Sequence, residues 1–169
     1  MQKNIIGVAI ALIVLLGIVW IAKPNPQINK ETASLSSSPN SNGILSVEGS
    51  SDYDFGTVSM AKGDVKYLFK IKNTGTEAVV INKIYTSCMC TTATIDIGNK
   101  KFGPYGMPGH GFIPKINEAL NPGEEADVEV TFDPKAHGPA GVGRIERVVS
   151  IENNTGQPLE FGFTATVTP

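Results

Sequence analysis

The chain has 169 residues, of which 41% are hydrophobic and 18% are charged. This is enough apolar material for one core of ordinary size, so we expect a single domain with appended segments. The 14 basic and 16 acidic residues give a formal charge of -2, which argues against nucleic acid as a partner, because binding to phosphates needs an excess of Lys and Arg. The 18 glycines and 11 prolines favour short strands joined by turns.

The N-terminus carries a hydrophobic segment. Residues 5–22 contain no charged side chain and are bounded by Lys3 and Lys23, and this length is just sufficient to span the hydrocarbon of a bilayer. A cleaved signal peptide is the alternative, but Trp20 occupies a position where cleavage needs a small residue. Residues 1–23 are therefore predicted to form an uncleaved transmembrane signal anchor, with the rest of the chain outside the cytoplasm, at the cell surface or in the periplasm.

Residues 24–43 consist mainly of Pro, Asn, Ser, Gln and Thr, with Ile28 and Leu35 as the sizeable apolar side chains. Such a segment cannot bury enough surface to fold and is predicted to be a flexible linker. The folded domain is then expected over residues 44–169.

Alternation of apolar and polar residues with a period of two predicts strands in this domain. The clearest runs lie within residues 65–71, 126–132 and 159–167, a weaker run lies within 145–151, and residues 78–85 are apolar on both faces, as in a central strand. Turn sequences separate these runs at residues 73–75, 121–123, 133–134 and 154–156. Six to eight short strands without a helical period predict an all-β fold, a two-sheet sandwich of the immunoglobulin-like type.

Five short motifs resemble a known family by their order along the chain. They are Asp54-Phe55-Gly56-Thr57-Val58, Asn73-Thr74-Gly75, Ser87-Cys88-Met89-Cys90-Thr91, Pro122-Gly123-Glu124 and Val130-Thr131-Phe132-Asp133. Residues 44–169 are on this basis similar to the bacterial family called domain of unknown function 1573. This chain has Met89 where the family usually has glycine, and residues 100–119 look like an insertion.

The resemblance implies an immunoglobulin-like sandwich of the ASH and PapD-like group, whose members act mainly in binding or scaffolding and lack an established enzyme activity. We therefore expect a module that is not an enzyme and that binds a protein or a cell-envelope component. A sheet edge or the loop at residues 100–119 would make the contact.

Cys88 and Cys90 are the only cysteines. On a regular strand they would share one face with Cα atoms about 6.6 Å apart, which is at the limit of about 6.8 Å for a disulfide. A bend would be needed for a disulfide, whereas both thiolates could lean toward one metal ion. Three alternatives stay open: the cysteines are small half-buried hydrophobic residues, they bind a metal, or they form a redox-active pair.

Further soft donors occur in two glycine-rich segments. Met107 and His110 lie in Gly-Met-Pro-Gly-His-Gly, and His137 lies in Ala-His-Gly-Pro. Together with Cys88 and Cys90 they form the candidate metal site, with copper(I) or zinc as the possible ion. Copper(I) suits the set that contains methionine better, and no Ser or Cys has a nearby base that would indicate catalysis.

Overall fold

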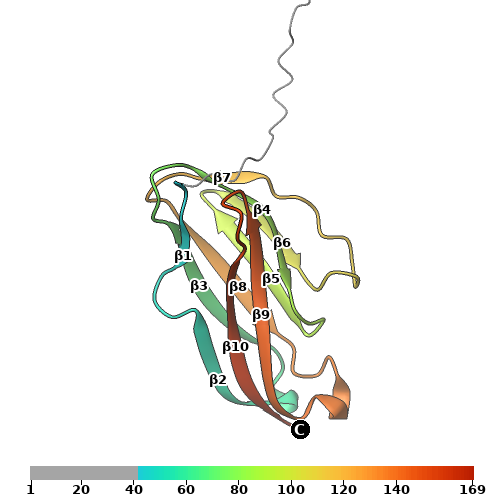
Figure 1. The fold of residues 1–169 in the computed structure, drawn as a ribbon. Helices are drawn as coiled ribbons and strands as arrows, with labels where there is room; N and C mark the ends of the chain where they lie inside the picture. Colours follow the sequence, from blue (N-terminus) through green and yellow to red (C-terminus); the bar gives the residue numbers. More distant parts are fainter. Residues whose placement is uncertain (1–41) are drawn as a thin grey trace, which may run out of the picture. The chain divides into compact units, whose positions relative to one another are not determined.

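The computed structural model describes residues 42–169, which form a β-sandwich (Figure 1). The predicted membrane anchor and nearly all of the predicted linker lie outside the described residues. Within residues 42–169, no helix has the length and the apolar character needed to cross a membrane.

Ten strands and two short 3₁₀ helices make up the described part of the chain. In chain order they are β1 (Leu45–Val47), β2 (Asp52–Ser59), η1 (Met60–Lys62), β3 (Val65–Asn73), β4 (Val79–Thr86), β5 (Thr91–Ile97), β6 (Lys100–Tyr105), β7 (Glu118–Leu120), β8 (Glu125–Phe132), η2 (Gly138–Gly141), β9 (Gly143–Asn153) and β10 (Leu159–Thr168). The prediction of an all-β, two-sheet sandwich is confirmed, and the architecture resembles the immunoglobulin-like sandwiches.

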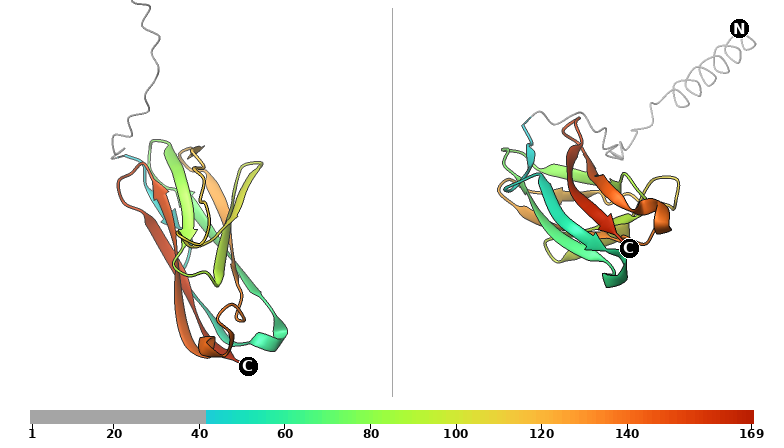
Figure 2. Two further views of the ribbon diagram at one scale, coloured as in Figure 1. Left: turned by 90° about the vertical axis from the view of Figure 1, so that its right-hand side faces the viewer. Right: turned by 90° about the horizontal axis from the view of Figure 1, so that it is seen from below.

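The strands form two five-stranded sheets that pack face to face (Figure 2). One sheet has the order β1-β3-β8-β5-β6 and the other the order β2-β10-β9-β4-β7. All neighbouring strands are antiparallel except β2 and β10, which are parallel. The inner faces bury the large apolar side chains that alternate along each strand, among them Phe69, Ile95 and Val130 from one sheet and Ile151 and Phe163 from the other.

The predicted turns separate strands, but three of the four also carry the chain from one sheet to the other. Residues 73–75, 121–123 and 133–134 connect strands of different sheets, whereas residues 154–156 form the hairpin between β9 and β10. The local sequence indicates where the chain turns. Which strand it then pairs with depends on the packing of the two layers.

Two expectations from the sequence are wrong in detail. The segment at residues 100–119 is not one loop, because it contains β6 and the start of β7 and leaves only residues 106–117 between them. The Cys-Met-Cys segment is not part of a strand, because it lies in the turn between β4 and β5.

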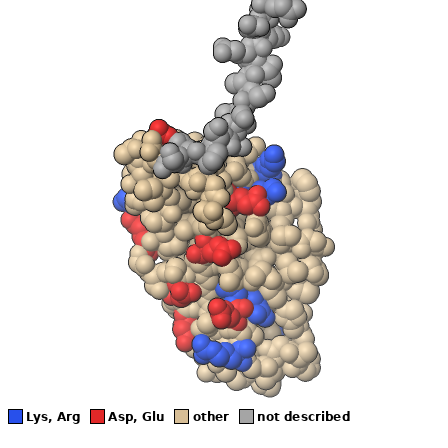
Figure 3. Space-filling view, in the orientation of Figure 1, with Lys and Arg blue, Asp and Glu red and all other residues tan. Residues whose placement is uncertain are grey.

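The outer face of the first sheet is polar. Lys66, Lys70 and Lys72 on β3 pair with acidic residues of the neighbouring strands, for example Lys66 with Glu129 at 2.9 Å. These exposed ion pairs stabilise the fold little. The face shown in Figure 3 likewise carries interspersed acidic and basic side chains and no continuous basic patch.

Candidate functional site

The turn between β4 and β5 brings the two cysteines together. Cys88 is half-buried, Cys90 is buried, and both are free thiols. The turn closes with a hydrogen bond from the Thr91 N–H to the Cys88 carbonyl oxygen at 3.1 Å. The Cys90 thiol donates to the Cys88 Sγ at 2.7 Å, so the bend brings the sulfur atoms closer than they would lie on a regular strand.

Buried hydrogen bonds fix this turn on the sandwich. The hydroxyl of Thr86, at the end of β4, lies 3.0 Å from the Cys88 carbonyl oxygen and 2.9 Å from that of Thr91, and it shares its one proton between them. The Asp133 N–H donates to the Cys90 carbonyl oxygen at 2.9 Å. The cysteines therefore have a defined position next to the end of β8.

His137 reaches the cysteines from the segment that follows β8. It immediately precedes η2, and η2 lies at the end of the sandwich that also holds the C-terminus (Figure 1). Its Nε2 lies 3.1 Å from the Cys88 Sγ. The ligand atoms of Cys88, Cys90 and His137 all lie within 4.8 Å of one another, and the imidazole is the exposed member of the group.

Arg147 on β9 completes the surroundings of the thiols. It is half-buried, and its Nε donates to the Cys90 Sγ at 3.1 Å. A second guanidinium nitrogen donates to the Glu146 carbonyl oxygen at 2.7 Å, which holds the side chain in place. The thiol pair thus lies beside a fixed positive charge.

The two thiols have opposite pKa shifts. Burial raises the pKa of Cys88, but hydrogen bonds from Cys90, contact with His137 and the charge of Arg147 outweigh burial and lower the pKa to about 7. Burial and the hydrogen bond to Cys88 raise the pKa of Cys90, and Arg147 and Thr91 offset this only in part. The structure therefore favours one thiolate, on Cys88, next to one thiol, on Cys90.

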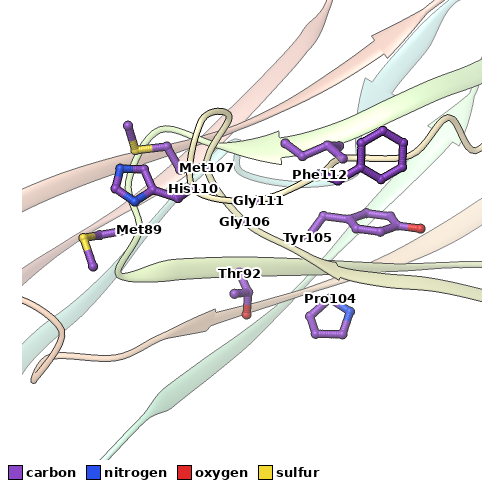
Figure 4. Close-up of a pocket in the computed structure, with 10 residues that line it drawn as sticks. Met89, Thr92, Pro104, Tyr105, Gly106, Met107, His110, Gly111 and Phe112 are labelled. Atoms are coloured by element: carbon purple, nitrogen blue, oxygen red, sulfur yellow. The ribbon is translucent and has the colours of Figure 1, made fainter.

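The structure separates the predicted metal-ligating residues into two groups. His137 joins Cys88 and Cys90, whereas Met107 and His110 line a pocket with Met89, and no cysteine lines that pocket (Figure 4). Arg147 was not among the predicted site residues. The sequence does contain a pattern that could have identified it. Arg147 is a charged residue at a position where the alternation of Ile145 and Val149 predicts an inward-facing apolar side chain.

Comparison with known families gives one match. Residues 46–103 match the family described as "Protein of unknown function (DUF1573)", in agreement with the resemblance drawn from the motifs. The matched segment contains both cysteines, and neither histidine lies in it. No curated protein matches the chain.

Solved structures with a similar fold include a protein of unknown function from Porphyromonas gingivalis W83. It is 17% identical with a TM-score of 0.55, and the match covers 80% of this chain and 51% of that one, so this chain spans about half its length. The secreted serine protease VesC from Vibrio cholerae is 12% identical with a TM-score of 0.45, over 77% of this chain and 24% of that one. The human CEP192 ASH / PapD-like domain is 15% identical with a TM-score of 0.42, over 86% of this chain and 98% of that one. At such identities these likenesses concern the fold alone.

Proposed function

We propose that this domain binds a soft metal ion, preferably Cu(I), through Cys88, Cys90 and His137. The observation that carries the proposal is the convergence of two sulfur atoms and one imidazole nitrogen within 4.8 Å. Thiolate and imidazole are the ligands that Cu(I) and Zn(II) take in proteins, and hard ions such as Mg²⁺ prefer oxygen.

The number of donors favours copper over zinc. Within residues 42–169, the group that could hold a metal ion has three donors, two from cysteines and one from a histidine, and no carboxylate. Structural zinc sites use four protein ligands, whereas Cu(I) has no fixed four-fold geometry. The site has three of these donors, which suits Cu(I).

Loading would require a small movement of the turn. Two thiolates on one three-coordinate ion stand roughly 4.0 Å apart if each metal–sulfur bond is about 2.3 Å, and the sulfur atoms are 2.7 Å apart here. They would therefore separate by about 1.3 Å. The exposed His137 side chain can adjust to this because it lies at the surface.

The proposed setting of this site is outside the cytoplasm. The uncharged run at residues 5–22 supports a membrane anchor there, and the domain would be displayed beyond the membrane to bind a protein or a cell-envelope component. In the segment at residues 106–117, Phe112 keeps 90% of its surface exposed, and this aromatic side chain is available for such a contact.

A competition titration of the reduced full chain tests the metal proposal. We expect a Cu(I) chelator to lose copper to the protein, and the copper bound by the cysteines should give a thiolate-to-copper absorption band. Cys88→Ser and Cys90→Ser should abolish the band, and His137→Ala should weaken this binding at least tenfold, whereas Lys135→Ala, close to His137 in sequence, should leave it unchanged. A chelator that keeps all its copper would refute the proposal.

A second candidate function is thiol–disulfide exchange, favoured by the 2.7 Å contact between the sulfur atoms and by the Arg147 hydrogen bond to Cys90. The Cys88 thiolate would attack a disulfide of a substrate protein and release one substrate sulfur, which takes up a proton. Cys90, on losing its proton, would then attack the Cys88 sulfur and release the second substrate thiol. The domain is oxidised to a Cys88–Cys90 disulfide and the substrate disulfide is reduced to two thiols.

His137 separates the two candidates. Metal binding needs the imidazole as a ligand, whereas the exchange reaction uses only the two sulfur atoms. A His137→Ala chain that keeps a reversible dithiol–disulfide couple in a glutathione redox titration, while its cysteines bind copper at least tenfold more weakly, supports both functions. A Cys88–Cys90 pair that never oxidises in that titration excludes the exchange reaction.

A further inference from the structure

A second group of soft donors lies beside the cysteine turn. Met89, Met107 and His110 line one cavity of about 380 Å³, and their side chains gather at one end of it (Figure 4). Met89 comes from the turn between β4 and β5, and the other two residues come from the segment after β6. The cavity is thus built where these two segments of the chain meet.

Backbone hydrogen bonds hold the two segments together. The Thr86 N–H donates to the Gly106 carbonyl oxygen at 3.1 Å, which joins the end of β4 to the segment that carries Met107. The His110 N–H donates to the Met107 carbonyl oxygen at 3.2 Å, so a tight turn brings the backbones of these two residues close to each other. The three donors therefore have a defined arrangement in the fold.

The chemistry of the lining selects the kind of ligand. It offers two thioether sulfurs and one imidazole, with no Asp, Glu, Lys, Arg or Cys among the lining residues. Ca²⁺ and Mg²⁺ need several oxygen ligands, and zinc sites use thiolate, imidazole or carboxylate. Thioether sulfur is a soft ligand that selects Cu(I).

Met89 is accessible from the solvent. It keeps 49% of its surface exposed although it stands between two cysteines that are half-buried or buried. Its side chain is therefore open to a ligand that enters the cavity.

We propose that Met89, Met107 and His110 form a second Cu(I) site, separate from Cys88, Cys90 and His137. It does not depend on the thiolate site, because the two sets share no ligand. The segment Cys88-Met89-Cys90 contributes ligands to both sets. The chain would therefore hold two copper ions, one on each side of this segment. The thioether site would keep its ligands even when the two thiols are oxidised to a disulfide.

The test uses the full chain with Cys88→Ser and Cys90→Ser, which leaves only the second site. We expect this chain to take one equivalent of Cu(I) from a weak chelator under anaerobic conditions. In methionine methyl NMR the signals of Met89 and Met107 should shift, and that of Met60 on η1, which does not line the cavity, should not. Zn(II) should cause no shift.

Substitutions in the same background identify the ligands. Met89→Leu, Met107→Leu and His110→Ala should each weaken Cu(I) binding at least tenfold, and Met60→Leu is the matched control because Leu replaces Met with little change of volume. No copper uptake by the cysteine-free chain, or uptake unchanged by Met89→Leu and Met107→Leu, overturns the proposal.

The unmodified chain gives an independent reading if the serine variants do not fold. It should bind two Cu(I) ions, and Met107→Leu should reduce the number to one while the thiolate-to-copper band stays. If copper shifts the methionine signals of the unmodified chain but gives no thiolate-to-copper band, the second site is present and only the thiolate site fails. A capacity of one ion that Met107→Leu leaves unchanged refutes the second site.

Discussion

At the scale of single residues, Cys88 is the group whose chemistry the fold changes most clearly. Its pKa lies near 7, below the ordinary value of about 8.5. Ionisation of Cys88 therefore stabilises the reduced fold at pH values above the ordinary pKa, and this contribution is lost as the pH falls through about 7. The raised pKa of Cys90 has the opposite effect. Its neutral thiol is favoured in the fold, so its contribution to the stability of the reduced fold is present at low pH and is lost at high pH.

This predicts an asymmetric pair of thiols in the metal-free, reduced chain. The rate of alkylation of Cys88 should rise with pH around a midpoint near 7, and Arg147→Gln should raise that midpoint and slow the reaction at neutral pH by about three- to tenfold. Arg144→Gln is the matched control, because Arg144 is an exposed residue of the same strand. Mass spectrometry of the labelled chain gives both rates, and equal titration of the two cysteines contradicts the assignment.

The side chain of Asn73 links several turns by hydrogen bonds to their backbones. It is fully buried, its Nδ2 donates to the carbonyl oxygens of Glu77 and Leu120 at 2.8 Å each, and its Oδ1 accepts from the Gly75 N–H at 3.0 Å. Asn73→Ala should lower the free energy of unfolding by about 3 kcal/mol, because buried carbonyl groups lose their donor. Asn121→Ala, which removes an exposed contact with Glu124, should cost less than about 1 kcal/mol in the same denaturant titration. Equal losses would contradict this role.

At the scale of elements, the strands are the part that the sequence predicts well. The alternation in β3, β8 and β10 identifies their inward faces, because the side chains of a strand point to opposite sides in turn. Ala93, Ile95 and Ile97 alternate in the same way with Thr92, Thr94 and Asp96 in β5, a strand that was not among those predicted. The pattern was present there, and the short side chains on its polar face made it less conspicuous.

The cysteine turn could not be predicted from its own residues. Its geometry depends on the Thr86 hydroxyl and on hydrogen bonds with the chain after β8, and these contacts exist only in the folded domain. The two histidines illustrate the same limit. The sequence offered both as ligands, and the path of the chain after β8 brings His137, rather than His110, to the sulfur atoms.

Thr86 should therefore control the site through the turn. Thr86→Val keeps the shape of the side chain but leaves the carbonyl oxygens of Cys88 and Thr91 without their donor, and it should lower the free energy of unfolding by about 1 to 3 kcal/mol. It should also weaken Cu(I) binding by the cysteines. Thr166→Val is the control, because Thr166 is exposed on β10. A Thr86→Val chain with unchanged stability and copper affinity would show that the turn forms without the hydroxyl.

At the scale of the whole molecule, the sandwich brings distant parts of the chain to one place. His137 lies 49 residues from Cys88, and Arg147 lies 57 residues from Cys90. The cysteines come from the turn between the sheets, His137 follows a strand of one sheet and Arg147 lies on a strand of the other. The site therefore requires the packed sandwich, and unfolding of the domain should release the metal.

X-ray absorption at the copper edge reads the ligands of the bound ion itself. The His110→Ala chain, in which the second site is disabled, would be loaded with one equivalent of Cu(I) in the reduced state. We predict a first shell of two sulfur atoms at about 2.3 Å and one nitrogen at about 2.0 Å, by analogy with thiolate and imidazole bonds to zinc. A shell of nitrogen and oxygen alone would contradict the assignment of Cys88, Cys90 and His137 as the metal site.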